Sequence, residues 1–233
     1  MKQWIERHKR ILQKAATALL AFLVGACLVF MIHPVKTLPK DRCLLSLSRM
    51  QADSQQFVAS SSKEPALEDL LSLDLARKEG KTQKNWVTLS AFVKKFGKAA
   101  SFTQEDTSFG AQVQLGYGTP VQGIYPYTIE FQKQDDTFYL SSIQGFAPKS
   151  AHYQSKKNVK LVDFTGYQTL DGKKEKGTAV EDVLKKSGLP NSLSLTSEKD
   201  KQVLALSYQV TDGLVSLTFE RDQTGQYRLT KKG

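Results

Sequence analysis

Cysteine and histidine are scarce in this chain of 233 residues. It has two cysteines and three histidines, and beyond Cys43 the only residue of either type is His152. A structural disulfide and a zinc site of the His/Cys type both need more of these side chains than that stretch contains. A domain that folds after residue 43 must therefore be stabilised by its hydrophobic core, and we expect it to bind neither a metal nor another cofactor.

The sequence motifs of common enzyme classes are also missing. There is no P-loop, no Rossmann glycine pattern and no G-x-S-x-G nucleophile elbow. The segment around His152 is polar and is predicted to be a linker. The pair Asp135–Asp136 is typical of a turn, and Glu181–Asp182 is typical of the first turn of a helix. We therefore predict that the protein is not an enzyme.

The chain is basic, but the charge is not concentrated where nucleic acid would need it. Its formal net charge is +10, and residues 1–35 contain five basic residues and one acidic residue, which leaves +6 for the remainder. A nucleic-acid-binding surface needs a basic stripe with interleaved aromatic side chains, and no such stripe occurs here. We expect no nucleic-acid partner.

The longest hydrophobic run follows a basic tail at residues 1–14. Residues 15–35 contain no charged side chain, and as a helix these 21 residues would span about 32 Å, close to the hydrocarbon core of a bilayer. The basic tail predicts a cytoplasmic N-terminus and a single-pass protein of the cell membrane, whose later domains are extracellular. Two alternatives remain open, a cleaved secretory signal and lipidation of Cys27 in "LVGAC". An exported chain with so few cysteines is typical of a Gram-positive bacterium.

A polar stalk is predicted at residues 36–64, and a pattern that occurs twice follows it. "FVKKFGKA" at 92–99 and "VLKKSGLP" at 183–190 place Gly97 and Gly188 at an offset of 91 positions. In both, apolar residues at helical spacing lead into two lysines and a glycine. Lysine in the last turn and glycine after it are typical of a helix C-terminus.

The segments after the two glycines alternate between apolar and polar residues, as antiparallel strands do. "LGY" at 115–117 matches "LSY" at 206–208 at the same offset, and "YTIEF" at 127–131 matches "VSLTF" at 215–219 at an offset of 88. The sequence predicts an α+β protein: a transmembrane helix followed by two tandem domains, at 65–149 and 158–233. Each domain would consist of a helix and a three-stranded antiparallel meander, with one sheet face covered by helices and the other polar.

This pattern resembles two known groups of proteins. A short helix that ends in Lys-Lys-x-Gly, then a strand that ends in Tyr and a strand that ends in Phe, is similar to the small lipoproteins of outer-membrane assembly. It resembles equally the beta-lactamase inhibitory protein fold, a tandem of two such units. The helix of that family often follows a Gly-Thr pair, which is present at Gly177–Thr178 and replaced by Val87–Thr88 in the first copy.

The resemblance covers about residues 65–148 and 158–233, and it implies a non-enzymatic protein-binding module that binds its partner on the open sheet face. In the first copy that face would present Gln112, Gln114, Thr128, Glu130 and Gln132. The inhibitory loop of the family has no recognisable match in this sequence, which argues against inhibition of a lactamase.

The loop "GYGTPVQGIYPY" at 116–127 is a second candidate for partner contact. It clusters Tyr117, Tyr125 and Tyr127 with two prolines, and rigid aromatic loops make good anchors in protein interfaces. We single out Tyr125 and Tyr127 as candidate binding residues. The alternative is a long hairpin connection that is packed by its own tyrosines.

The preferred hypothesis is a membrane-anchored, extracytoplasmic and non-catalytic module that binds an envelope or membrane protein during cell-envelope assembly or regulation. One alternative is an accessory subunit of a membrane secretion or conjugation machine. Others are an inhibitor of a hydrolase on the secreted side and an envelope hydrolase that uses carboxylates alone.

Overall fold

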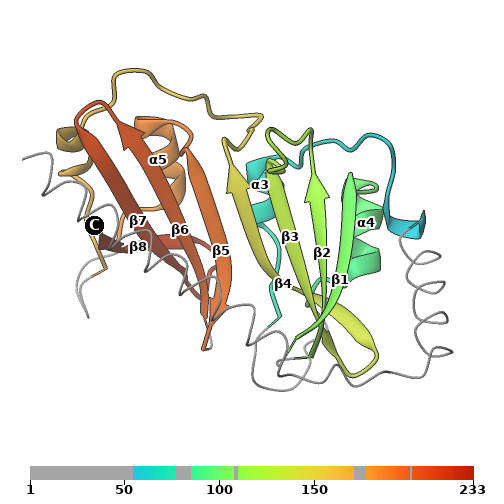
Figure 1. Ribbon diagram of the computed structural model, residues 1–233. Helices are drawn as coiled ribbons and strands as arrows, with labels where there is room; N and C mark the ends of the chain where they lie inside the picture. Colours follow the sequence, from blue (N-terminus) through green and yellow to red (C-terminus); the bar gives the residue numbers. More distant parts are fainter. Residues whose placement is uncertain (1–54, 77–84, 108–109, 171–176, 200) are drawn as a thin grey trace, which may run out of the picture. The chain divides into compact units, whose positions relative to one another are not determined.

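The chain divides into two compact units, Met1–Ser48 and Arg49–Gly233. The computed structural model describes residues 55–76, 85–107, 110–170, 177–199 and 201–233, all of which belong to the second unit (Figure 1). The predicted basic tail at 1–14, the hydrophobic run at 15–35 and most of the stalk at 36–64 lie outside the described residues.

The second unit is built on one eight-stranded antiparallel sheet whose strands lie side by side in sequence order. The strands are β1 (Ser101–Thr107), β2 (Gly110–Tyr117), β3 (Tyr127–Gln134), β4 (Thr137–Phe146), β5 (Ser192–Glu198), β6 (Lys201–Val210), β7 (Gly213–Arg221) and β8 (Tyr227–Lys232). The helices are few and short: α3 (Leu67–Leu71), α4 (Leu89–Phe96), the 3-10 helix η1 (Leu161–Phe164) and α5 (Val180–Ser187). Figure 1 shows α3, α4 and α5 on the same side of the sheet.

The predicted fold class is therefore wrong in how it arranges the strands into sheets. The prediction was two separate three-stranded meanders, but each half contributes four strands and the halves share one sheet. Hydrogen-bonded pairing of β4 with β5, from Ser142↔Thr196 to Phe146↔Ser192, joins the halves. The domain boundaries at 65–149 and 158–233 stay a prediction.

The prediction missed two strands, β1 and β5. Their sequence pattern is weak for physical reasons. β1, "SFTQEDT", forms one edge of the sheet and has no fully buried side chain, so no apolar alternation marks it. β5, "SLSLTSE", does alternate, with Leu193 and Leu195 buried and serines between them. Its serine content and its short length favour a turn as readily as a strand when the sequence is read alone.

The predicted single-pass membrane topology is corrected as well. Among the described residues no helix is both long and apolar enough to cross a membrane. The run at 15–35, on which the predicted localisation depended, is not among those residues.

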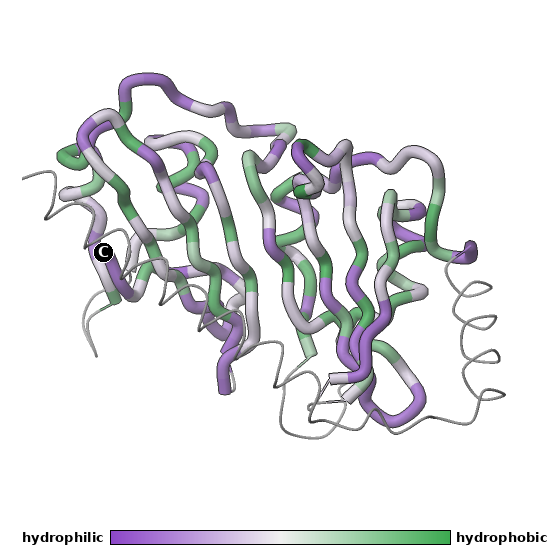
Figure 2. The backbone as a smooth tube through the Cα atoms, in the orientation of Figure 1, coloured by the Kyte–Doolittle hydropathy of each residue, from purple (hydrophilic) through white to green (hydrophobic). Residues whose placement is uncertain are grey.

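The hydrophobic core lies between the sheet and the helices. In the first half, Phe92 of α4 is fully buried and its ring contacts those of Phe96, Tyr117 and Phe131, with ring centroids 4.5 to 5.7 Å apart. In the second half, the ring of Phe164 from η1 packs on that of Tyr208, with centroids 5.1 Å apart. Figure 2 shows how hydrophobic and hydrophilic residues alternate along the strands, so that one face of the sheet packs on this core.

The same helix-to-strand contact occurs in both halves. The hydroxyl of Tyr117 donates to the carbonyl of Gly97 (2.8 Å), and the hydroxyl of Tyr208 donates to the carbonyl of Gly188 (3.2 Å). Both residues of this contact are offset by 91 positions between the halves. The register shifts at Glu130/Phe131 and Thr218/Phe219 are offset by 88 positions. The contacts thus recur at the two offsets found in the sequence.

Candidate functional site

The uncovered face of the sheet carries rows of mostly polar side chains. Strand register aligns one residue from each strand, and the alternation of side chains in a strand keeps the aligned residues on one face. One row consists of Thr103, Gln114, Glu130, Ser142, Thr196, Val203, Glu220 and Arg228. The next row consists of Ser101, Gly116, Thr128, Gln144, Ser194, Ala205, Thr218 and Lys231. We call this surface the open face.

Glu130 is the centre of a hydrogen-bonded group on the open face. Its carboxylate accepts from Gln114 Nε2 (3.3 Å) and from Ser142 Oγ (2.6 Å). A shallow hollow of about 170 Å³ lies beside it, and Gln112, Gln114 and Glu130 are among its lining residues. These bonds orient the carboxylate, while Gln114 remains exposed to solvent.

The structure brings together five of the predicted partner-binding residues. Gln112 lies opposite Gln132, Gln114 lies opposite Glu130, and Thr128 lies one row further along β3. The period-two alternation of β2 and β3 was therefore enough to place all of these side chains on one surface.

The two candidate tyrosines of the 116–127 loop lie on opposite faces of the sheet. A Cβ added to Gly116, which belongs to the open face, would lie 2.6 Å from the ring of Tyr125, so that this ring lies on the open face. Tyr127 is fully buried, and its ring lies 2.7 Å from the position of a Cβ at Gly145 on the covered face. A partner cannot reach Tyr127 in this structure, and the loop packs partly on its own aromatic rings.

Among the residues that the structure describes, no group of three or more His, Cys, Asp or Glu side chains could hold a metal ion. Ser150 and His152 lie near Glu68, but their contacts are structural hydrogen bonds, which we call the Glu68–Ser150 clamp. Ser150 Oγ accepts from the backbone amides of His152 (2.9 Å) and Tyr153 (2.8 Å) and donates to the Glu68 carboxylate.

This clamp fixes the segment after β4 to α3. Burial opposes ionisation of Glu68, but the hydrogen bonds from Ser150 and from the backbone amides of residues 151 and 152 outweigh it and lower the pKa of the carboxyl group. The sequence has no signal for the clamp, because Glu68 and Ser150 are 82 positions apart.

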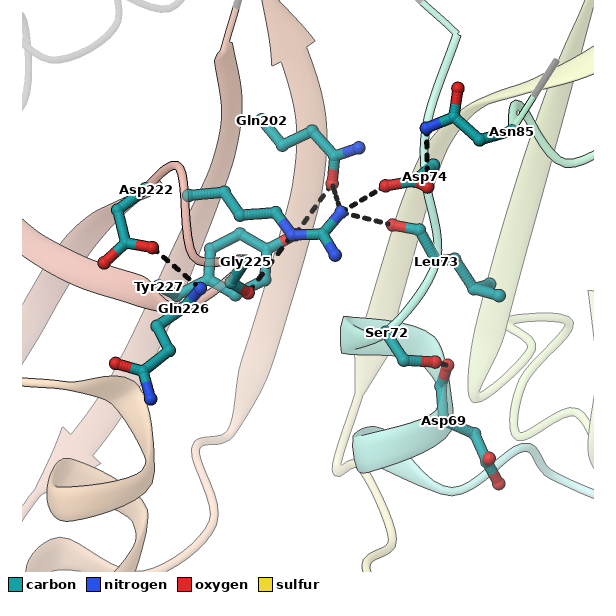
Figure 3. A network of polar contacts seen from close by, with 11 residues as sticks. Asp69, Ser72, Leu73, Asp74, Asn85, Gln202, Asp222, Gly225, Gln226 and Tyr227 are labelled. Carbon is teal, nitrogen blue, oxygen red and sulfur yellow. Dashed lines mark hydrogen bonds and ion pairs between the residues drawn. The ribbon is translucent and has the colours of Figure 1, made fainter. Parts of the chain in front are cut away.

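A second polar network connects the two halves on the covered side of the sheet (Figure 3). Arg221, at the end of β7, forms an ion pair with Asp74 and donates to the carbonyl of Leu73 (3.4 Å) and to the side chain of Gln202 (3.3 Å). Gln202 also accepts from the hydroxyl of Tyr227 (3.0 Å). The side chain of Arg221 is 19% exposed and that of Asp74 is 33% exposed, so this pair is shielded from water more than a typical surface pair.

We expect the pair Arg221–Asp74 to be energetically coupled. Arg221→Met and Asp74→Asn should each lower the free energy of unfolding by about 1 to 3 kcal/mol, because each leaves a shielded charge or dipole without its partner. Their coupling energy in a double-mutant cycle should be about 1 kcal/mol, measured by denaturant unfolding.

The control is the exposed pair Lys95–Asp69, whose charged atoms lie 3.6 Å apart and whose side chains are 46% and 55% exposed. Its coupling should stay below about 0.5 kcal/mol. Equal coupling energies for the two pairs would show that Arg221 does not connect the halves.

Comparison with known proteins yields one distant structural likeness. No protein-family model and no curated protein matches this chain. A crystal structure of a candidate beta-lactamase inhibitor protein from Streptococcus mutans matches with 14% sequence identity and a TM-score of 0.42. The match covers 73% of this chain and 97% of that chain. At this identity and TM-score the likeness assigns neither a family nor a partner to this chain.

Proposed function

We propose that the second unit is a non-catalytic protein-binding module and that its open face receives the partner. One observation carries the proposal: an eight-stranded sheet has one face covered by helices and the other open, with rows of mostly uncharged polar side chains. An antiparallel sheet can be stable with one face in water. The fold therefore does not need this face to be covered, and the face is available to a partner. The serine and threonine side chains on this broad, rigid surface lose little conformational entropy when a protein docks on it.

The part of the open face around Glu130 favours a protein over a small molecule. The hollow beside Glu130 has a volume of about 170 Å³, below the range of about 300 to 1,000 Å³ that is typical of small-molecule sites. The side chains of Gln114, Thr128 and Ser194 offer both donors and acceptors, which suits the peptide groups and amides of a partner surface. The ring of Tyr125 adds an aromatic contact at the end of this face.

The proposal predicts that charge placed on the open face disrupts a specific association. The full chain and the variants Gln114→Arg and Thr196→Arg are purified, each with a tag, from cells that naturally contain the protein. A partner should be recovered with the unmodified chain and be reduced at least tenfold with both variants, because a buried unpaired guanidinium costs more than 1.4 kcal/mol. Quantitative mass spectrometry measures the recovery.

Ser90→Arg is the matched control, since Ser90 is exposed on α4, on the covered side of the sheet. It should leave recovery unchanged, and thermal unfolding should confirm that all three variants fold. The proposal fails if no protein is lost selectively with the two open-face variants.

We also propose that the two halves are two copies of one unit, as the resemblance to a tandem architecture implies. The recurrence of the Tyr-to-Gly contact at an offset of 91 and of the register shift at an offset of 88 supports this. No contact in the described residues favours the secretion-machine subunit, the hydrolase inhibitor or the carboxylate hydrolase over the binding module.

A further inference from the structure

The exposed large hydrophobic side chains of the described residues are gathered at one end of the sheet. This end, at the top of Figure 1, is formed by the connections β2–β3, β4–β5 and β6–β7, and we call it the apolar end. It carries Val121, Ile124, Phe146, Leu161, Val162 and Leu214, which are 42% to 72% exposed, whereas Leu170 lies apart beside β8. The opposite end carries charged turns, such as Asp135–Asp136 in β3–β4 and Asp222 before β8.

The first of two clusters at the apolar end is a small rigid hairpin. Val121 and Ile124 exchange both backbone hydrogen bonds, at 2.9 and 3.0 Å, around a two-residue turn in which Gln122 and Gly123 have positive φ angles of 52° and 81°. This geometry is that of a tight hairpin turn. It holds the Val121 side chain 72% exposed and the Ile124 side chain 58% exposed. Phe146 lies beside this loop, since its amide donates to the carbonyl of Pro126 (2.8 Å).

The second cluster is equally well anchored. The amide of Leu161 donates to the Asp212 carboxylate (2.8 Å), and the side chain of Leu161 lies 3.2 Å from the position of a Cβ at Gly213. Val162 and Leu214, the neighbours of these residues in the chain, are 64% and 63% exposed. Hydrogen bonds therefore hold apolar side chains in contact with water at two places. The exposed area of these side chains does not stabilise the core.

A polar pocket with one lysine in its lining, which we call the basic pocket, lies between the clusters. It has a volume of about 160 Å³, and its lining includes Ala147, Lys156, Asn158, Asn191, Gln209 and Thr211. The ammonium group of Lys156 donates to the carbonyl of Lys186 (2.7 Å) and has two further protons to donate.

The charge around the pocket is not balanced. Two carboxylates belong to neighbouring segments, Asp163, which accepts the amide of Lys160 (2.9 Å), and Asp212, which accepts the amide of Leu161 (2.8 Å). Lys157 and Lys160 are exposed, and within the described part of the chain neither forms an ion pair. Lys156, Lys157 and Lys160 outnumber these two carboxylates, so a carboxylate from outside would meet a net positive charge.

We infer that the partner docks at the apolar end, through a protein segment that places an acidic side chain in the basic pocket and apolar side chains on both clusters. This inference rests on the proposed function and adds where the partner enters and what chemistry it presents. The pocket is small, about 160 Å³, and an interface gains most from a few anchors that fill such pockets. The clusters are about four strand spacings apart, roughly 19 Å, which a single protein surface can span.

Two other occupants fit the observations less well. In a symmetric contact with a second copy the same patch faces itself, so that the lysines at 156, 157 and 160 would meet the same lysines. A lipid surface could contact the apolar side chains and the positive charge, but it would leave the small pocket unfilled.

The experiment places a photo-crosslinking amino acid in the full chain, in cells that naturally contain the protein. The positions are Ile124 and Leu214 at the apolar end, Thr196 on the open face, and Gln223 in the β7–β8 turn at the opposite end. We expect Ile124 and Leu214 to form adducts with the same protein, in a peptide that carries Asp or Glu beside apolar residues. Lys156→Glu together with Lys157→Glu should lower the adduct yield at least fivefold, whereas Lys199→Glu, an exposed charge reversal at the opposite end, should not.

Adducts from Ile124 and Leu214 without adducts from Thr196 would support this inference and overturn the open face as the surface that receives the partner. Adducts from Thr196 without adducts from Ile124 and Leu214 would overturn this inference and leave the proposed function standing. Adducts with a second copy or with lipid would overturn the protein occupant, and adducts from Gln223 alone would place the partner elsewhere. Absence of adducts from all four positions would count against both the inference and the proposed function.

Discussion

Above about pH 10 the second unit is expected to lose stability steeply and to unfold in one cooperative step. Four tyrosines, Tyr117, Tyr127, Tyr208 and Tyr227, are almost completely buried. Burial is the leading cause that raises the pKa of each phenol far above its ordinary value of 10. The folded state therefore keeps four protons at a pH at which the unfolded chain releases them.

The sign of the effect follows from linkage. The folded pKa is raised, so the full stability is present below the unfolded pKa of about 10 and is lost as pH rises beyond it. In that range each group lowers the free energy of unfolding by about 1.4 kcal/mol for every unit that the pH rises. The four groups together lower it by about 5 to 6 kcal/mol per pH unit. This is comparable with the whole free energy of unfolding of a typical domain, about 5 to 15 kcal/mol.

Ultraviolet absorbance of tyrosinate and far-ultraviolet circular dichroism, recorded together against pH, check this expectation. At least half of the tyrosinate signal, that of the four buried phenols among eight tyrosines, should appear at the pH at which the strand signal disappears. Tyr208→Phe should make the pH dependence about one quarter less steep, although loss of its hydrogen bond to Gly188 costs about 1 kcal/mol at neutral pH. Gradual ionisation of all tyrosines while the dichroism stays native would contradict the burial of these four rings.

Alanine at Gly188 should destabilise the protein more than alanine at Gly97, although both glycines end a helix in the same way. Their φ angles are 81° and 85°, and their ψ angles of −167° and 179° place both in a backbone region that is open essentially to glycine alone. The backbone strain should cost about 1 to 3 kcal/mol at either position. The surroundings differ, however.

A Cβ at Gly188 would lie 2.5 Å from the carbonyl oxygen of Gln154, on a backbone segment that is bridged to Gly188 through Ser155. A Cβ at Gly97 would meet no atom within 4 Å. We therefore expect Gly97→Ala to show the strain alone, and Gly188→Ala to lose about 1 to 3 kcal/mol more through overpacking. Denaturant unfolding measures both values.

Gly166→Ala is the control, because a Cβ there would meet only the end of the flexible Lys186 side chain, at 3.8 Å. It should change the free energy of unfolding by less than about 0.5 kcal/mol. Equal losses for the variants at Gly97 and Gly188 would show that the segment after β4 does not pack on the end of α5 as the structure places it.

The open face could be predicted from the sequence in its central part and not at its end. The alternation in β2 and β3 placed Gln112, Gln114, Glu130 and Gln132 on one surface because side chains of a strand alternate with a fixed period of two. That same alternation directs Tyr127 to the core, so the expectation that Tyr127 contacts a partner is wrong. The exposure of Val121 had no signal, since a loop has no period and an apolar residue in a loop can be buried or exposed.

By itself, the sequence determined where α4 and α5 end and which residues of β2, β3, β6 and β7 face the core, because caps and period-two alternation are local properties. Only the tertiary structure decided that the two halves share one sheet through β4 and β5, and that Arg221 meets Asp74 across 147 positions of the chain. The physical reason is that strand edges pair through backbone groups, which every residue except proline carries alike. Which edge meets which therefore depends on how the helices and the connecting segment pack, and not on a pattern within either strand.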